Sequence, residues 1–104
     1  MVEIMIKRIK DLTEADKKRY LQSIKREIEG SGQSWEFYET KIREEIDTTF
    51  DDEAFSKMDP EFAVDAAYAR RDFKWSEKHQ KPEFVDYILW MGAFCTGSDL
   101  VDIV

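Results

Sequence analysis

A largely apolar stretch near the C-terminal end, residues 84–95, in which Asp86 is the one charged residue, limits the folds open to this chain. From Tyr87 to Cys95 the only polar side-chain groups are a phenol hydroxyl and an indole N–H. Pro82 and Glu83 precede the stretch, and both residue types are common in the first turn of a helix. A helix that is apolar on nearly every face has to be surrounded by other elements. We therefore expect residues 84–95 to form a central helix inside a bundle.

Two segments upstream begin with residues that cap helices. Thr13 is followed by Glu14 and Asp16, and Gly30 closes that segment. Ser34 begins the next segment, which the pair Thr48-Thr49 interrupts. The apolar stripe of this second segment recurs at helical spacing: Trp35, Tyr38, Ile42 and Ile46. The pattern predicts two helices joined by a short loop.

Two further helix starts follow in the acidic middle of the chain. Asp51 or Asp52 can cap a short helical turn that ends near Met58. The sequence Asp59-Pro60-Glu61 combines a cap, a proline at the first helical position and an acid in the first turn. It predicts a third long helix that extends to about His79, with one stripe formed by Phe62, Ala66, Ala69 and Phe73.

The two ends of the chain carry strand signals. Val2, Ile4 and Ile6 alternate with other residues, which is the period of a half-buried strand. Val101 and Ile103 flank Asp102, so the last segment is either a strand that pairs with residues 2–7 or a final short helix. The sequence thus predicts a mostly α single domain, residues 1–104, with four to five helices and a short two-stranded β element as one option for the termini.

The chain lacks the residue patterns of common catalytic and metal sites. It has one histidine, His79, and one cysteine, Cys95, which exclude a His/Cys zinc site within the chain and an internal disulfide. Cys95 ends an apolar helix and is expected to be buried and inert. Residues 47–59 lack the glycine and the alternating ligands of a calcium loop, and no Gly-rich phosphate loop occurs. We expect no cofactor, no metal and no enzymatic activity; a carboxylate enzyme using Glu61 or Asp65 beside Tyr68 is the weakest alternative.

The net charge of −7 is unevenly distributed. Residues 34–66 contain eleven acidic and three basic side chains, whereas residues 1–33 contain six acidic and eight basic ones. A strongly negative field repels nucleic acid and favours a basic protein partner. The charge pattern therefore indicates protein binding through the middle third of the chain.

Two short resemblances to known families occur. Residues 4–24, with Asp11-Leu12-Thr13-Glu14-Ala15-Asp16 between a strand and a helix, are similar to the opening of GNAT acetyltransferases, but the Gly-rich acetyl-CoA loop of that family is missing. Residues 11–15 and 97–101 are similar to two pieces of colicin/pyocin DNase immunity proteins, which are small acidic helical inhibitors. Here the pieces are much farther apart, and Asp102 and Ile103 replace the family's paired tyrosines. We interpret this second similarity as shared helix-start residues.

These observations predict a small acidic protein-binding module, of the inhibitor, immunity or anti-restriction type, that docks an acidic surface on a basic partner. That partner could be a nucleic-acid-processing protein. The alternative is a homo-oligomeric structural or accessory subunit, for example a homodimer. No secretory signal or membrane span is visible, so we expect a cytoplasmic protein. The residues expected to bind the partner are Trp35, Tyr38, Glu44, Glu45, Asp47, Asp51, Asp52, Glu53 and Phe55.

Overall fold

The protein is mostly helical, as the sequence predicts. The computed structural model describes residues 5–73 and 80–103. Its elements, in chain order, are β1 (Met5–Arg8), the 3₁₀ turn η1 (Ile9–Asp11), α1 (Glu14–Gly30), α2 (Trp35–Thr49), α3 (Asp52–Ser56), α4 (Pro60–Asp72), α5 (Phe84–Thr96) and β2 (Leu100–Ile103). Helix α5 is followed by Gly97, whose φ of 69° provides the left-handed turn that leads into β2.

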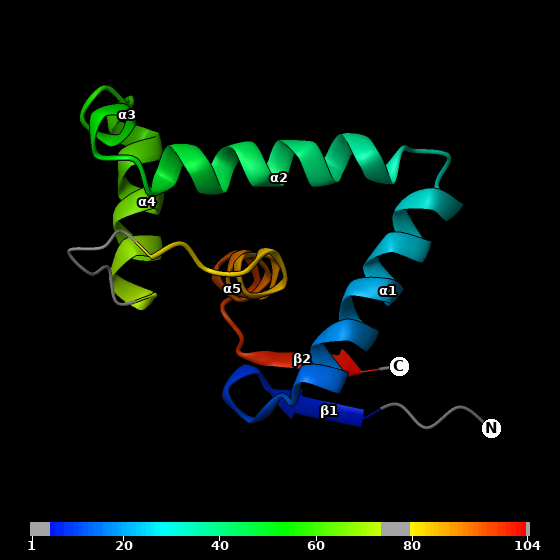
Figure 1. Ribbon diagram of the computed structural model, residues 1–104. Coiled ribbons are helices and arrows are strands. Elements are labelled where there is room, and N and C mark those ends of the chain that lie inside the picture. The colour runs from blue at the N-terminus through cyan, green and yellow to red at the C-terminus, as the bar shows by residue number, and fades with distance from the viewer. Residues whose placement is uncertain (1–4, 74–79, 104) are drawn as a thin grey trace.

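The helices are arranged around α5. Figure 1 shows α2 along one side, with α1 at its N-terminal end and α3 and α4 at its C-terminal end, while the two strands lie at the far side from α2. Helix α5, seen end-on, lies between α2 and the strands and packs against both α1 and α2. An ion pair between Lys17 and Asp86, 2.8 Å long, joins α1 to the start of α5. This placement confirms that the apolar stretch forms the central helix.

The predicted pairing of the terminal segments is confirmed, but the predicted buried face of the first strand is wrong. Strands β1 and β2 are antiparallel, with Met5 opposite Ile103 and Ile6 opposite Asp102. Ile103 is 2% exposed, whereas Ile6 is 63% exposed. The physical reason is that Lys7, on the inner side of β1, extends its ammonium group to Asp16 of α1, so that its neighbour Ile6 faces outward. Val2 and Ile4 lie outside the described residues.

Asp16 fixes the start of α1. Its carboxylate accepts hydrogen bonds from the Lys7 ammonium at 2.8 Å and from the Thr13 N–H at 3.1 Å, while the Thr13 hydroxyl accepts one from the Asp16 N–H. This reciprocal arrangement is a capping box, and it confirms the predicted cap at Thr13. The hydrogen bonds from Lys7 and Thr13 hold the pKa of Asp16 at about 2, below its ordinary value of 3.8.

The lowered pKa makes Asp16 a source of acid sensitivity. Because its pKa is lower in the folded chain than in the unfolded chain, its stabilising effect is present above about pH 4 and is lost as the pH falls towards 2. We expect the urea midpoint of unfolding to fall over this range in the wild type and to fall less in Asp16→Asn. Lys7→Met should also weaken the dependence of the urea midpoint on pH, since it removes the main group that lowers the pKa of Asp16. If the urea midpoint of Asp16→Asn depended on pH as that of the wild type does, Asp16 would not be the source of the acid sensitivity.

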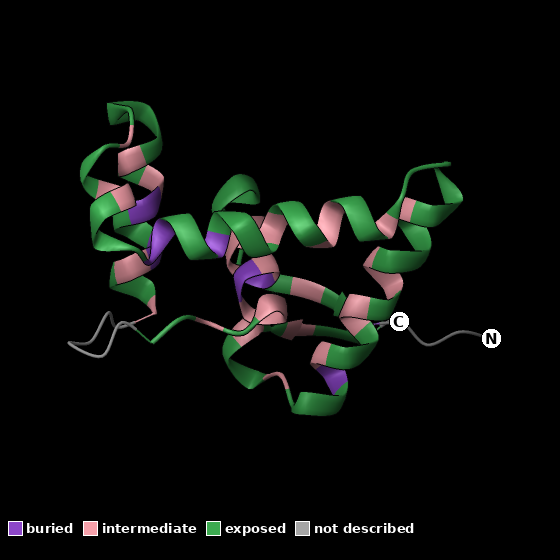
Figure 2. Ribbon diagram, turned by 45° about the horizontal axis from the view of Figure 1, so that its top comes forward, coloured by how far each residue is buried: buried purple, intermediate pink, exposed green. Residues whose placement is uncertain are grey.

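The core lies on two sides of α5. Tyr87 is buried with Ile46, Phe50 and Ala69, so this cluster joins α5, α2 and α4. Leu89 is 1% exposed and lies outside that cluster. It is two residues after Tyr87, and each residue of an α-helix adds a rotation of about 100°, so Leu89 points about 200° away from Tyr87 around the helix axis. The prediction of a fully enclosed helix fails in its last turn, where Phe94 is 45% exposed and Cys95 is also exposed. Figure 2 shows that most of the remaining ribbon is exposed or half-buried.

Several predicted helix boundaries are corrected by the structure. Helix α2 continues through Thr48, whose hydroxyl donates to the Glu44 carbonyl at 2.9 Å, and ends beside Phe50, which is only 2% exposed. Helix α5 begins at Phe84, two residues after Pro82, because Glu83 has extended backbone angles. The predicted extension of the third long helix to His79 lies outside the described residues. The predicted caps of Ser34 and Asp51 are confirmed.

Candidate functional site

The acidic middle third folds into one end of the molecule. The C-terminal half of α2, the short α3 and the first turns of α4 meet there (Figure 1). Thr49 and Phe50 are both buried at the point where the chain leaves α2. Burial of this connection folds α3 back against α2, so acids that are distant along the chain gather at the same end.

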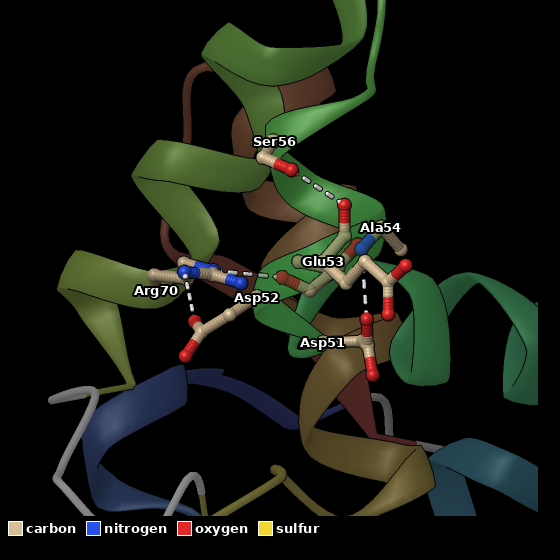
Figure 3. Close-up of polar contacts among 7 residues, drawn as sticks. Asp51, Asp52, Glu53, Ala54, Ser56 and Arg70 are labelled. Carbon is tan, nitrogen blue, oxygen red and sulfur yellow. Dashed lines mark hydrogen bonds and ion pairs between the residues drawn. The ribbon is translucent and has the colours of Figure 1, made fainter.

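The acids of α3 serve partly to hold the fold together (Figure 3). Asp51 accepts a hydrogen bond from the Ala54 N–H at 2.8 Å, which caps α3, and Glu53 pairs with Lys57 at 3.1 Å. Asp52 pairs with Arg70 of α4 at 3.1 Å. These contacts reduce the negative charge that α3 presents to solvent.

Arg70 ties α3 and α4 to the end of α2. Its Nε donates to the Thr49 carbonyl at 2.8 Å, and its guanidinium lies 4.1 Å from the centroid of the Phe55 ring. Phe55 is half-buried, and the Arg70 guanidinium lies over its ring. Of the predicted binding residues, Phe55, Asp51 and Asp52 all have contacts that stabilise this corner of the protein.

The structure separates Trp35 and Tyr38 from the acids with which the sequence grouped them. Both belong to the N-terminal half of α2, and Trp35 lies about 15 Å along the helix from Glu45 at 1.5 Å per residue. Trp35 packs edge-on against Phe84, with ring centroids 5.9 Å apart, and the Tyr38 hydroxyl donates to Gln33. These two aromatic side chains are thus not adjacent to the acidic end.

A hollow of about 630 Å³ lies next to Trp35, between α2 and the start of α5. Its polar rim is largely neutralised by ion pairs within the chain. Glu39 pairs with Arg43 at 3.0 Å, and Asp47 pairs with Lys81. Asp47, another predicted binding residue, is therefore already matched with a base.

A second groove, of about 550 Å³, lies at the acidic end and is bounded by α2, α4, α5 and the turn between α3 and α4. Tyr87, Met91 and Ala66 contribute from the interior. Phe62 of α4 also lines it and is 65% exposed, whereas Ala66 and Ala69, on the same predicted stripe, are buried. Four carboxylates line the same groove: Glu44, Glu45, Asp59 and Asp65. We call this the acidic groove.

The carboxylates of the acidic groove lack ion-pair partners among residues 5–73 and 80–103. In the part of the chain that the structure describes, none of the four forms an ion pair. Asp59 precedes α4 without a side-chain capping hydrogen bond, contrary to the sequence expectation. Of the two lysines that line the groove, Lys57 is paired with Glu53, so Lys41 is the remaining base. Burial raises the pKa of the Tyr87 hydroxyl, and the nearby charges of Glu45 and Asp65 raise it further.

Sequence reasoning found Glu44 and Glu45 but missed most of the groove. Phe62, Asp65 and Met91 come from α4 and α5, and nothing in their spacing indicates that they meet α2. The one local hint was Phe62 itself, an aromatic residue placed between Glu61 and Asp65 in the first turns of a helix. Cys95, expected to be buried, is exposed, and His79 lies outside the described residues. Within residues 5–73 and 80–103, no three His, Cys, Asp or Glu side chains converge as metal ligands.

Comparison with known proteins adds no identification. No protein-family model, curated protein or solved structure gives a significant match to this chain. The two short resemblances noted in the sequence therefore do not extend to a family match. Among the described helices, none has both the length and the apolar character needed to cross a membrane.

Proposed function

We propose that this protein is a small non-enzymatic binding module that docks its acidic end on a basic protein partner. The observation that carries the proposal is the gathering, at the acidic groove, of carboxylates from α2 and from the start of α4 that have no ion-pair partner within the described part of the chain. An inhibitor, such as an immunity or anti-restriction protein, is the class that fits best. A nucleic-acid-processing protein is a suitable target, because proteins that bind phosphate backbones present basic surfaces. The single cysteine favours a reducing compartment, the cytoplasm.

The physical mechanism is electrostatic steering followed by apolar contact. Unmatched carboxylates at one end of a molecule attract a basic surface over roughly a Debye length, about 8 Å at physiological ionic strength. Such steering increases the association rate and makes it depend on salt. The paired acids Asp47, Asp52 and Glu53 contribute less to this field than the unmatched ones, because bases of the same chain lie beside them.

The test compares two variants that change the net charge equally. The first neutralises exposed acids at the acidic end: Glu44→Gln, Glu45→Gln, Asp59→Asn and Glu61→Gln. The control neutralises exposed acids elsewhere: Asp11→Asn, Glu27→Gln, Glu36→Gln and Asp102→Asn. Each tagged chain is used to capture proteins from the native host at low salt, and the captured proteins are identified by mass spectrometry. The candidate partner is then purified, and its association rate is measured as a function of salt.

We expect the wild type and the control to capture the same basic protein and the first variant to lose it. The association rate of the purified pair should fall steeply as ionic strength rises. The proposal is wrong if no basic protein distinguishes the two variants, or if the association rate does not respond to salt.

One observation supports the alternative of a homo-oligomeric subunit. Among the described residues the sheet has two strands, so each strand has an edge without a neighbouring strand. Ile6 and Leu100 are 63% and 51% exposed on its outer side. Sedimentation over a range of concentrations tests this alternative: a dimer that Ile6→Lys dissociates would support it, and a monomer at all concentrations would exclude it.

A further inference from the structure

The interior of the acidic groove offers an adaptable apolar surface. Phe62 is the most exposed large apolar side chain of α4, at 65%. It shares the groove with the half-buried Met58 and Met91. Methionine side chains are flexible and polarisable, so they adjust to apolar ligands of different shape. An exposed phenylalanine in a groove that two methionines also line is suited to take up an apolar side chain from a partner.

The charges of the groove select the partner's chemistry. Glu44 and Glu45 come from the α2 side, and Asp59 and Asp65 come from the α4 side. Since these carboxylates lack ion-pair partners among the described residues, a ligand with positive charges on both flanks of an apolar strip would match them. A purely cationic ligand would leave the apolar interior uncovered, and a purely apolar ligand would desolvate the acids without compensation.

The walls of the groove favour a helical ligand. Apart from the turn between α3 and α4, they are formed by α2, α4 and α5, whose backbone N–H and C=O groups bond within each helix. An extended peptide therefore finds no strand edge there. Strands β1 and β2, whose outer edges have no neighbouring strand among the described residues, lie on the opposite side of α5 from α2 (Figure 1). A helix carries its own backbone hydrogen bonds and can bury side chains without leaving unpaired backbone groups.

We infer that the acidic groove binds an amphipathic helix of a basic partner protein. The apolar face of that helix packs on Phe62, Met58 and Met91, and its flanking Lys and Arg side chains pair with carboxylates of α2 and α4. The inference rests on the proposed function and adds to it the site, the anchor residue and the shape of the ligand.

The experiment is a selection from a displayed library of helical peptides, using the full chain as bait. We expect the selected peptides to carry apolar residues at helical spacing flanked by Lys and Arg. A synthetic peptide of the consensus is then titrated against the wild type and Phe62→Ala. We expect Phe62→Ala to raise the Kd at least about tenfold, as truncation of an anchor residue does. Spermine, a cation without an apolar face, should bind at least about tenfold more weakly than the peptide.

The matched control is Phe37→Ala. Phe37 is 59% exposed and lies near the start of α2, outside the groove, so the same truncation there should leave the Kd unchanged. Both variants should melt as the wild type does, because both side chains are mostly in solvent. Perturbed amide signals in an NMR titration should map to α2, α4 and α5 around the groove.

Several results would overturn the inference: no enrichment of basic amphipathic sequences, equal Kd values for wild type and Phe62→Ala, or spermine binding as tightly as the peptide. A dimer of the free protein that Phe62→Ala dissociates would also overturn it, by placing a second copy in the groove. The proposed function fails separately. If a captured basic partner binds Phe62→Ala normally, the proposed function is supported and the groove is not its binding site. If helical peptides are selected but no partner is captured, the groove is supported as a peptide-binding site and the proposed function is not.

Discussion

Replacing Leu89 with alanine should lower the free energy of unfolding by about 3 kcal/mol, measured by urea denaturation. Leu89 lies in the centre of α5 and is 1% exposed, so the truncation removes apolar contacts and leaves a cavity. Because domains of this size are stable by only about 5–15 kcal/mol, this one change would remove a large part of the total. The prediction tests whether α5 is packed on the side that lies away from Tyr87.

Leu100→Ala is the matched control for Leu89→Ala. Leu100 has the same side chain but is 51% exposed on the outer side of β2. We expect its truncation to change the free energy of unfolding by less than about 1 kcal/mol. If the two variants were destabilised equally, Leu89 could not be buried as the structure shows, and the central position of α5 would be wrong.

Replacing Ala69 with leucine should destabilise the protein by about 2 kcal/mol through overpacking. Ala69 of α4 is 1% exposed and belongs to the cluster that contains Ile46, Phe50 and Tyr87. A larger side chain there has no free volume to enter, so α4 must move away from α2 and α5. That movement would also widen the acidic groove, whose α4 side contains Asp65 and Phe62.

Ala67→Leu is the control for the overpacked variant, because Ala67 lies on the same helix but is exposed. Its substitution should leave the free energy of unfolding within about 0.5 kcal/mol of the wild type. Urea denaturation measures both variants under the same conditions. Equal tolerance of leucine at the two positions would show that α4 does not dock through Ala69.

The local features of the fold could be predicted because they depend on neighbours in the chain. The hydroxyl of Thr13 and the carboxylate of Asp51 cap helices through hydrogen bonds that span three residues. The antiparallel pairing of the terminal segments followed from alternation in short apolar stretches, once the option of a final helix is set aside by the structure. For the two caps, the signal and the interaction lie within a few residues of each other, whereas the strand pairing joins segments from opposite ends of the chain.

The errors arose where a distant residue decides the outcome. Ile6 was expected to be buried, but Lys7 faces inward because Asp16 of α1 binds its ammonium group. Phe50 was not recognised as a core residue, since its burial depends on α4 and α5 packing around the end of α2. Phe62 shares its predicted stripe with Ala66 and Ala69, which are buried, yet Phe62 itself is 65% exposed.

Composition and short-range periodicity were enough to predict the mostly helical fold, the central apolar helix and the acidity of the middle third. The packing of the helices in space decides which acids of the described residues have an ion-pair partner and which have none. Asp52 meets Arg70 and Asp47 meets Lys81, whereas Glu44, Glu45 and Asp65 come together around Phe62. The reason is that an ion pair or a groove requires side chains from separate helices to meet in space. The order of charges along the chain does not show how far apart two such side chains lie in the folded protein.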